Sequence, residues 1–173
     1  AELKISGYTV QTKIYDGTRS AVFLKPLSVD GAGFVITAVN GAINLTDATA
    51  EYQALLNSVI VSGTFVSAGV GKNVSVSNIK FTYPAADEAI WKNYIILYDE
   101  SVDEDLTGEI TVRDAVVEVY DVSVTYGQTA NLKYTYSSAK ADGTIVDGIL
   151  PQDDLGITLS RTDSTNLSVG KYT

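Results

Sequence analysis

The 173-residue chain contains no histidine, no cysteine and no methionine, and only three prolines. Without histidine and cysteine, the sequence excludes a Ser-His-Asp triad, a cysteine nucleophile, a disulfide and the usual ligands of zinc and haem. No apolar stretch approaches the roughly 20 residues of a membrane-spanning helix. The lack of both sulfur residues leaves almost nothing oxidisable, which suits a protein outside the cell, with chance in a short chain as the alternative. No signal peptide or initiator methionine opens the sequence, so we expect a mature fragment or an excised piece.

Basic residues are also few, with 12 Lys and Arg against 21 Asp and Glu, and the net charge is −9. This balance argues against nucleic acid and anionic membranes as partners, because both attract Lys and Arg. Residues 99–121 hold nine acidic residues and one base, Arg113, and so carry −8, whereas residues 1–98 hold seven of each sign. The acidic block therefore indicates a junction between two near-neutral segments.

The residues that are abundant point to short strands joined by turns. Eleven Tyr and 14 Gly, with many Val, Ile and Thr, predict a mainly β (β-rich α+β) fold. Alternation and short apolar runs predict strands over residues 8–15, 21–29, 34–39, 59–66, 74–83, 93–98, 109–124 with a break at Arg113-Asp114, 132–136, around 157–159, and from 169. Turns are expected at Asp16-Gly17, Asp142-Gly143 and Asp147-Gly148.

Two further local features are predicted. The first is one short helix over residues 46–57, with Thr46 as its N-cap and Asp47 in the first turn. The second lies in residues 74–83, where apolar positions change parity between Val76 and Ile79. One extra residue near Ser77-Asn78 would keep both on the same face, so we predict a β-bulge there.

Two segments share an outline in which a tyrosine ends a strand and a glycine follows in the turn. They are Lys13-Ile14-Tyr15-Asp16-Gly17-Thr18 and Val124-Thr125-Tyr126-Gly127-Gln128-Thr129, and each unit closes on a strand around a second tyrosine, Tyr94 or Tyr172. A tyrosine at the end of a sheet can bury its ring and place its hydroxyl in a turn. The pattern indicates two related units, with chance pairing in a Tyr-rich chain as the alternative.

These motifs resemble known surface-protein repeats. Residues 8–98, with the Lys13–Thr18 motif, Val70-Gly71-Lys72-Asn73-Val74 and Asn93-Tyr94, resemble the YDG repeat of bacterial surface proteins. Residues 114–173, with Tyr126-Gly127, Leu132-Lys133-Tyr134 and Gly170-Lys171-Tyr172, resemble the MBG domain, a mostly-β, β-grasp-like repeat.

The resemblance implies two tandem small β domains at 1–113 and 114–173. The first carries an insertion, about 40–58, that holds the helix, and we expect the second to be cut short within its last strand. The resemblance further implies a secreted or cell-wall-attached adhesin-like protein on the bacterial surface, with adjacent repeats of the same polypeptide as neighbours and no catalytic residues.

Two motifs in the sequence have possible chemistry. Gly69-Val70-Gly71-Lys72 has Val66 and Asn73 where a P-loop requires Gly and Ser or Thr, so a glycine-rich strand connection is the better interpretation. Residues 103–114 partly match an EF-hand loop, with Asp103 and Asp105 at positions one and three, Gly108 at six and Asp114 at twelve. The twelfth residue is Asp rather than Glu and strand follows, so a Ca²⁺ site competes with a solvated acidic loop.

Function is therefore expected to be non-catalytic. The leading hypothesis is a monomeric stalk module, without cofactors beyond the candidate Ca²⁺, without nucleic acid and without membrane insertion. The alternative is an adhesive module that binds a host or environmental glycan or protein through tyrosine-rich loops or the insertion. An enzyme is disfavoured, because the paired carboxylates cluster on the junction and Trp91 is the only tryptophan for stacking a sugar.

Overall fold

The computed structural model describes residues 1–26, 33–39, 49–98, 106–161 and 170. It confirms the mainly β fold class: 39% of the described residues are in strands and 11% in helices. Residue contacts divide the chain into two compact units, Ala1–Val112 (unit 1) and Arg113–Thr173 (unit 2). No described helix has the length and apolar character needed to span a bilayer.

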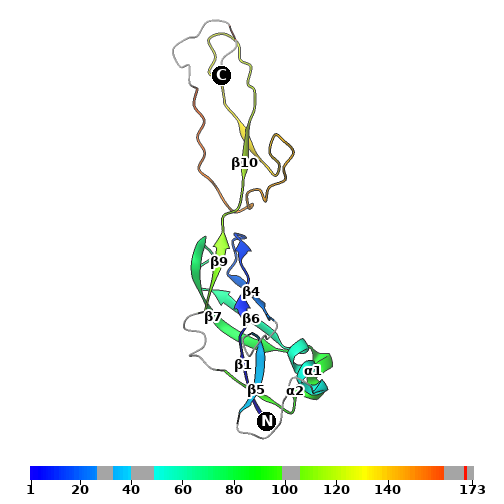
Figure 1. The fold of residues 1–173 in the computed structure, drawn as a ribbon. Helices are drawn as coiled ribbons and strands as arrows, with labels where there is room; N and C mark the ends of the chain where they lie inside the picture. The colour runs from blue at the N-terminus through cyan, green and yellow to red at the C-terminus, as the bar shows by residue number, and fades with distance from the viewer. Residues whose placement is uncertain (27–32, 40–48, 99–105, 162–169, 171–173) are drawn as a thin grey trace. The chain divides into compact units, whose positions relative to one another are not determined.

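Unit 1 is built on two sheets (Figure 1). The first has the order β5 (Val35–Val39), β1 (Glu2–Ser6), β8 (Ile95–Leu97), in which β1 is antiparallel to β5 and parallel to β8. The second has six strands in the order β2 (Thr9–Val10), β4 (Ser20–Leu24), β6 (Ile60–Phe65), β7 (Gly71–Thr82), β9 (Thr107–Thr111), β3 (Lys13–Ile14).

The six-stranded sheet curls into a half-barrel because one short segment supplies both of its edges. Strand β2 pairs antiparallel with β4, and the backbone N–H of Gln11 extends this pairing to Val22 O at 2.8 Å. Strand β3 pairs in parallel with β9, and Tyr15 N–H extends it to Thr111 O at 3.0 Å. The prediction of a single strand over residues 8–15 was therefore wrong, since the chain changes partner within it.

The predicted β-bulge in β7 is confirmed. Ser62 lies opposite Lys80, but Thr64, two residues on, lies opposite Ser77, three residues back. The extra residue is accommodated where Asn78 adopts a left-handed φ of 56°. Val76 and Ile79 are consequently both buried in the core, as the parity change requires.

In the described part of the chain, short helical elements accompany the sheets: α1 (Ala50–Ser58), the 3₁₀ turn η1 (Ala85–Asp87) and α2 (Glu88–Trp91). Helix α1 confirms the predicted helix, but its N-cap is Thr49, whose hydroxyl accepts from Tyr52 N, so the assignment of the cap to Thr46 was wrong. Thr46 itself lies outside the described residues. Helix α2 was not predicted, because four residues are too few to show a helical period.

The core of unit 1 contains large side chains from both sheets and the helices. The largest fully buried ones are Trp91, Phe65, Leu3, Leu55, Ile110 and Val59. The Trp91 indole N–H donates to Ser58 Oγ at 2.7 Å, and the Tyr83 ring stacks on Trp91 with centroids 5.2 Å apart. Strand β1, which is not predicted from the sequence, supplies the buried Leu3 and Ile5. With only Leu3 and Ile5 apolar among its five residues, the alternation in β1 is too short to predict a strand.

Unit 2 is a hairpin of β10 (Val116–Val119) and β11 (Tyr134–Ser137) followed by turns. β9 and β10 are separate strands, which confirms the break predicted at Arg113-Asp114. Arg113 Nε and Nη2 donate to the carbonyls of Gly148 and Asp147, each at 2.6 Å. The strand predicted around 157–159 is wrong, because these residues join no ladder. Most of the strand predicted from residue 169 lies outside the described residues.

Replacement of Gly108 by alanine should destabilise unit 1. A Cβ at this position of β9 would lie 2.6 Å from Val10 Cγ1 and 2.9 Å from Phe65 Cε1, inside the curl. We expect a loss of about 1–3 kcal/mol in the free energy of unfolding, measured by denaturant titration of Trp91 fluorescence. Gly69→Ala is the control, since its nearest neighbour is the Ser67 hydroxyl at 3.3 Å. Equal stability of the two variants would contradict the close packing of β2 on β9.

The bulge makes a second prediction, at Asn78. A β-branched residue tolerates a left-handed φ poorly, so Asn78→Val should lose roughly 1–2 kcal/mol of stability. Asn78→Gly keeps the backbone conformation and loses the side-chain amide bonds to Thr64 Oγ1 and Ser77 Oγ. Thermal melts should therefore rank the glycine variant above the valine variant. The reverse order would show that the strand pairs without the bulge.

Candidate functional site

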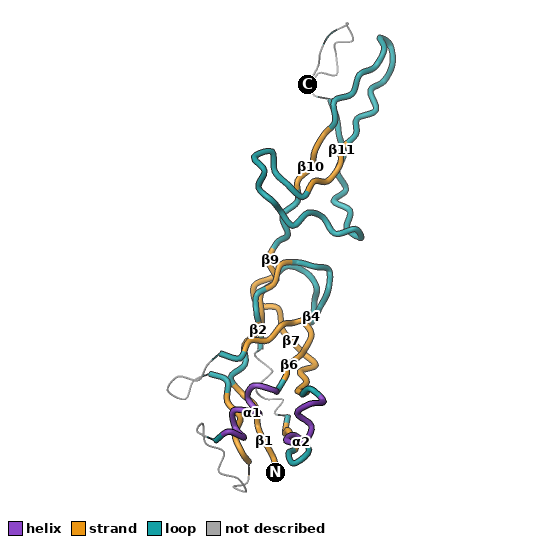
Figure 2. Tube along the Cα trace, turned by 90° about the vertical axis from the view of Figure 1, so that its right-hand side faces the viewer, coloured by secondary structure: helices purple, strands orange, loops and turns teal. Residues whose placement is uncertain are grey.

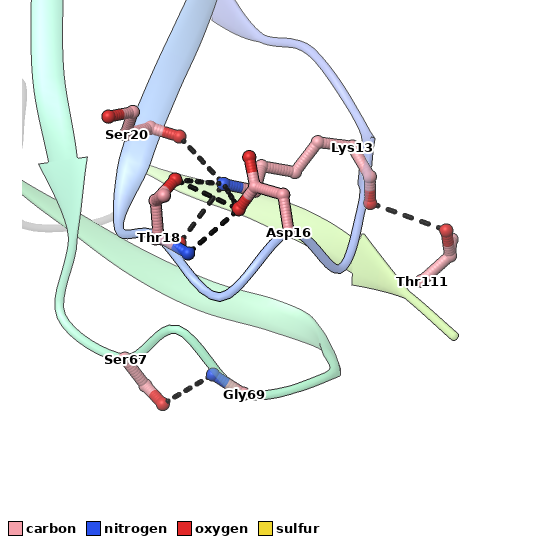
Figure 3. Close-up of polar contacts among 7 residues, drawn as sticks. All are labelled: Lys13, Asp16, Thr18, Ser20, Ser67, Gly69 and Thr111. Atoms are coloured by element: carbon pink, nitrogen blue, oxygen red, sulfur yellow. Dashed lines mark hydrogen bonds and ion pairs between the residues drawn. The ribbon is translucent and has the colours of Figure 1, made fainter. Parts of the chain in front are cut away.

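A densely connected polar group of unit 1 surrounds the Lys13 ammonium, and we call Lys13, Asp16, Thr18 and Ser20 the Lys13 cluster (Figure 3). Lys13 belongs to β3, Asp16 and Thr18 to the turn that follows, and Ser20 opens β4. Lys13 Nζ lies 2.6 Å from Asp16 Oδ1 and donates to Thr18 O, Thr18 Oγ1 and Ser20 O at 3.0, 3.1 and 3.2 Å. Four acceptors surround three N–H donors, so the ammonium is fully engaged.

The turn that holds the cluster follows from its sequence. Asp16 Oδ1 accepts from Thr18 N and from Thr18 Oγ1, each at 2.8 Å, as an aspartate does when it closes a turn on its own backbone. Gly17 between them has φ 74°, which glycine adopts without a steric penalty. The turn predicted at Asp16-Gly17 is confirmed. The Lys13 contact, which ties the turn to the strand before it, was not predicted.

The cluster strongly favours the ionised form of Asp16. Partial burial alone would raise the pKa of Asp16, but the hydrogen bonds from Lys13 and Thr18, together with the Lys13 charge, lower it from 3.8 to about 2. A carboxylate with so low a pKa is a poor general base near neutral pH. The contacts of Asp16 with Lys13 and Thr18 therefore hold the turn together around an ionised carboxylate.

A second lysine closes the end of helix α1. Lys25 Nζ donates to Leu56 O at 2.9 Å and to Val59 O at 3.0 Å, where the helix leaves its last carbonyls unpaired. It also lies 5.6 Å from the centroid of the Phe34 ring, and burial lowers its pKa below the usual 10.5. This contact joins residues more than 30 positions apart, so no local sequence pattern predicts it.

Tyr94, singled out as a closing tyrosine, makes one strong polar contact. Its ring packs against the core, and its hydroxyl donates to Glu51 Oε1 at 2.6 Å, on helix α1 rather than in a turn. Burial and the bond to the Glu51 carboxylate raise the pKa of Tyr94 to about 12. Tyr94 therefore attaches the helix to the sheet, and its phenol stays protonated under ordinary conditions.

The candidate Ca²⁺ ligands are not brought together in the part of the chain that the structure describes. Asp103 and Asp105 lie outside it, whereas Asp114 is exposed and its backbone carbonyl accepts from Gly148 N at 2.9 Å. Gly108, the sixth loop position, is in β9 opposite Val74. Among the described residues no group of three or more acidic side chains gathers. Calcium binding at Asp103, Asp105 and Asp114 stays a prediction.

The other two motifs have structural explanations. Gly69 lies in the connection between the antiparallel strands β6 and β7, where its N–H donates to Ser67 Oγ at 3.0 Å, which agrees with a glycine-rich strand connection. Trp91 is 1% exposed and covered by the stacked Tyr83, so it offers no platform for a sugar. No family model matches this chain, and neither a curated protein nor a solved structure matches it significantly.

Acid should expose the contribution of Asp16. Because the folded-state pKa is lowered, this carboxylate stabilises unit 1 fully above about pH 4, and its contribution is lost as the pH falls toward 2. Asp16→Asn should therefore lower stability at pH 6 and weaken its decline below pH 4, as followed by Trp91 emission in denaturant. Asp142→Asn removes a similar turn carboxylate of unit 2 and should leave unit 1 unchanged. An unaltered acid profile in Asp16→Asn would contradict the assignment.

Proposed function

We propose that the chain is a non-catalytic stalk module of a secreted or cell-wall-attached bacterial adhesin-like protein. The observation that carries this proposal is the path of the chain through unit 1. Strand β1 begins at one end of the unit, and β9, its last strand, runs out at the opposite end (Figures 1 and 2). A module with its two connections at opposite ends lengthens a chain of modules instead of folding it back.

The chemistry of the described side chains supports the same proposal. The Lys13 and Lys25 ammonium groups are engaged by carbonyl and carboxylate oxygens, and the Asp16 carboxylate is a weak base. The motif Lys13–Thr18, on which the resemblance to YDG repeats chiefly depends, thus fixes a turn of the framework. The MBG-like identity of residues 114–173 and the position of the module on the cell surface are part of this proposal.

The alternative is a binding module, and one surface favours it. Val22 and Leu24 of β4 and Ile60 of the adjacent β6 are 55%, 46% and 48% exposed, on the outer side of the curled sheet. Neighbouring aliphatic groups of this kind suit a protein partner better than a glycan, which generally requires aromatic and polar contacts.

Binding and localisation experiments separate the two functions. For a stalk, the intact 173-residue chain should show no saturable binding on glycan and protein arrays, and antibodies against it should label unpermeabilised cells of the source organism. Val22→Thr combined with Ile60→Thr is the matched variant, since threonine keeps the β-branch and removes apolar surface. Saturable binding that this variant abolishes would establish the binding module instead. Retention of the protein inside the cell would contradict both.

A further inference from the structure

Among the described residues of unit 1, two strand pairs are parallel, and both lie on the path between its first and last strands. Strand β1 pairs in parallel with β8 through Glu2↔Ile95 to Lys4↔Leu97. Strand β3 pairs in parallel with β9 through Lys13↔Ile110 and Ile14↔Thr111. The remaining pairings of unit 1 are antiparallel in the described residues.

Parallel pairs respond to tension differently from hairpins. In a parallel pair, the beginning of one strand and the end of the other lie at opposite ends of the ladder. Tension on unit 1 reaches β3 at its beginning, through β1, and leaves from the end of β9, so it slides these strands along each other. The hydrogen bonds of the ladder are then loaded together, whereas the bonds of a hairpin pulled from its open end break one after another.

The Lys13 cluster reinforces the pair β3–β9, which is weak because it is short. Strand β3 has only two residues, but Thr111 Oγ1 of β9 donates to Lys13 O at 3.3 Å, next to the ladder bond from Tyr15 N–H to Thr111 O. On the other side, the Lys13 ammonium holds Thr18 O and Ser20 O, at the start of β4. Strand β3 is thus fixed to β9 by its backbone and to β4 by its side chain (Figure 3).

We propose that the pairs β1–β8 and β3–β9 form a mechanical clamp that resists stretching of unit 1, with Lys13 as the residue that anchors β3 in it. The value of such a clamp to the organism rests on the proposed stalk function. The resistance itself is a property of unit 1, and it can be measured on the isolated chain.

The test is single-molecule stretching of the 173-residue chain, held by handles at its two ends. Unfolding of unit 1 releases up to 112 residues and unfolding of unit 2 up to 61, so the extensions, roughly 3.3–3.6 Å per residue, identify each event. Lys13→Met removes the ammonium on the force path. Lys25→Met is the matched control, because it removes an ammonium that is also held by backbone carbonyls, but at the end of α1, away from that path.

At constant force, Lys13→Met should unfold unit 1 about tenfold faster or more, because charge-assisted hydrogen bonds must break before the strands slide. Lys25→Met should lower stability in denaturant and leave the rate under force nearly unchanged. If Lys13→Met does not fold, Thr111→Val provides the test, since it removes the bond to Lys13 O and preserves the shape of the side chain.

The pair β1–β8 is tested by Ile95→Pro against Ile95→Ala, because only proline removes the N–H that donates to Ala1 O at 2.8 Å.

Two outcomes would refute the clamp. In the first, Lys13→Met and Lys25→Met both accelerate unfolding under force, each only in proportion to its loss of stability. In the second, Lys13→Met and Thr111→Val fold and resist force like the wild type. These outcomes do not depend on where the protein resides. A cytoplasmic location would overturn the stalk function and leave the clamp standing, whereas refutation of the clamp would leave a surface location untouched.

Discussion

The architecture of unit 1 depends on the backbone pairing of one short segment with two different strands. Residues Thr9–Val10 join β4, and Lys13–Ile14 join β9 at the far edge of the same sheet. Free sheet edges expose unpaired N–H and C=O groups and invite association, and here both edge strands are very short, at two residues each. The segment also places Val10 beside Gly108 and Phe65, which explains why β9 has glycine at this position.

Polar side-chain contacts then connect the strands of the curled sheet to one another and to helix α1. Lys13 fastens the β3 end of the segment to the start of β4, Lys25 fastens the end of β4 to the end of α1, and Tyr94 fastens α1 to the region of β8. Each contact uses a side chain with a long reach and places its polar end at the margin of the core. Such groups keep their apolar stems packed and satisfy carbonyls that the strands and helix leave open.

Local signals in the sequence predicted the local structure well. The parity change between Val76 and Ile79 identified the bulge, because a strand with one buried face cannot shift by one residue without exposing it. The helix near Leu55 was also found from its spacing, although its cap was placed three residues early. Residues 8–15 were misinterpreted because alternation continues through Gln11, and periodicity does not record a change of partner strand. The candidate site could be predicted only in part: Asp16-Gly17 specifies its turn, but the oxygens around Lys13 meet only after β3 and β4 are placed.

Strand β7 also constrains how this protein can change over evolution. Its first residues pair with β9, its last residues pair with β6, and register shifts interrupt both pairings. A residue inserted into or deleted from β7 without a compensating change in its bulges would turn the side chains of one half of the strand to the opposite face. The length of β7 is therefore constrained more tightly than the identity of its exposed side chains. The exposed connection around Gly69 has no such restriction. Lineages of this protein should therefore vary in length between β6 and β7, and new sequence can enter there without rebuilding the core.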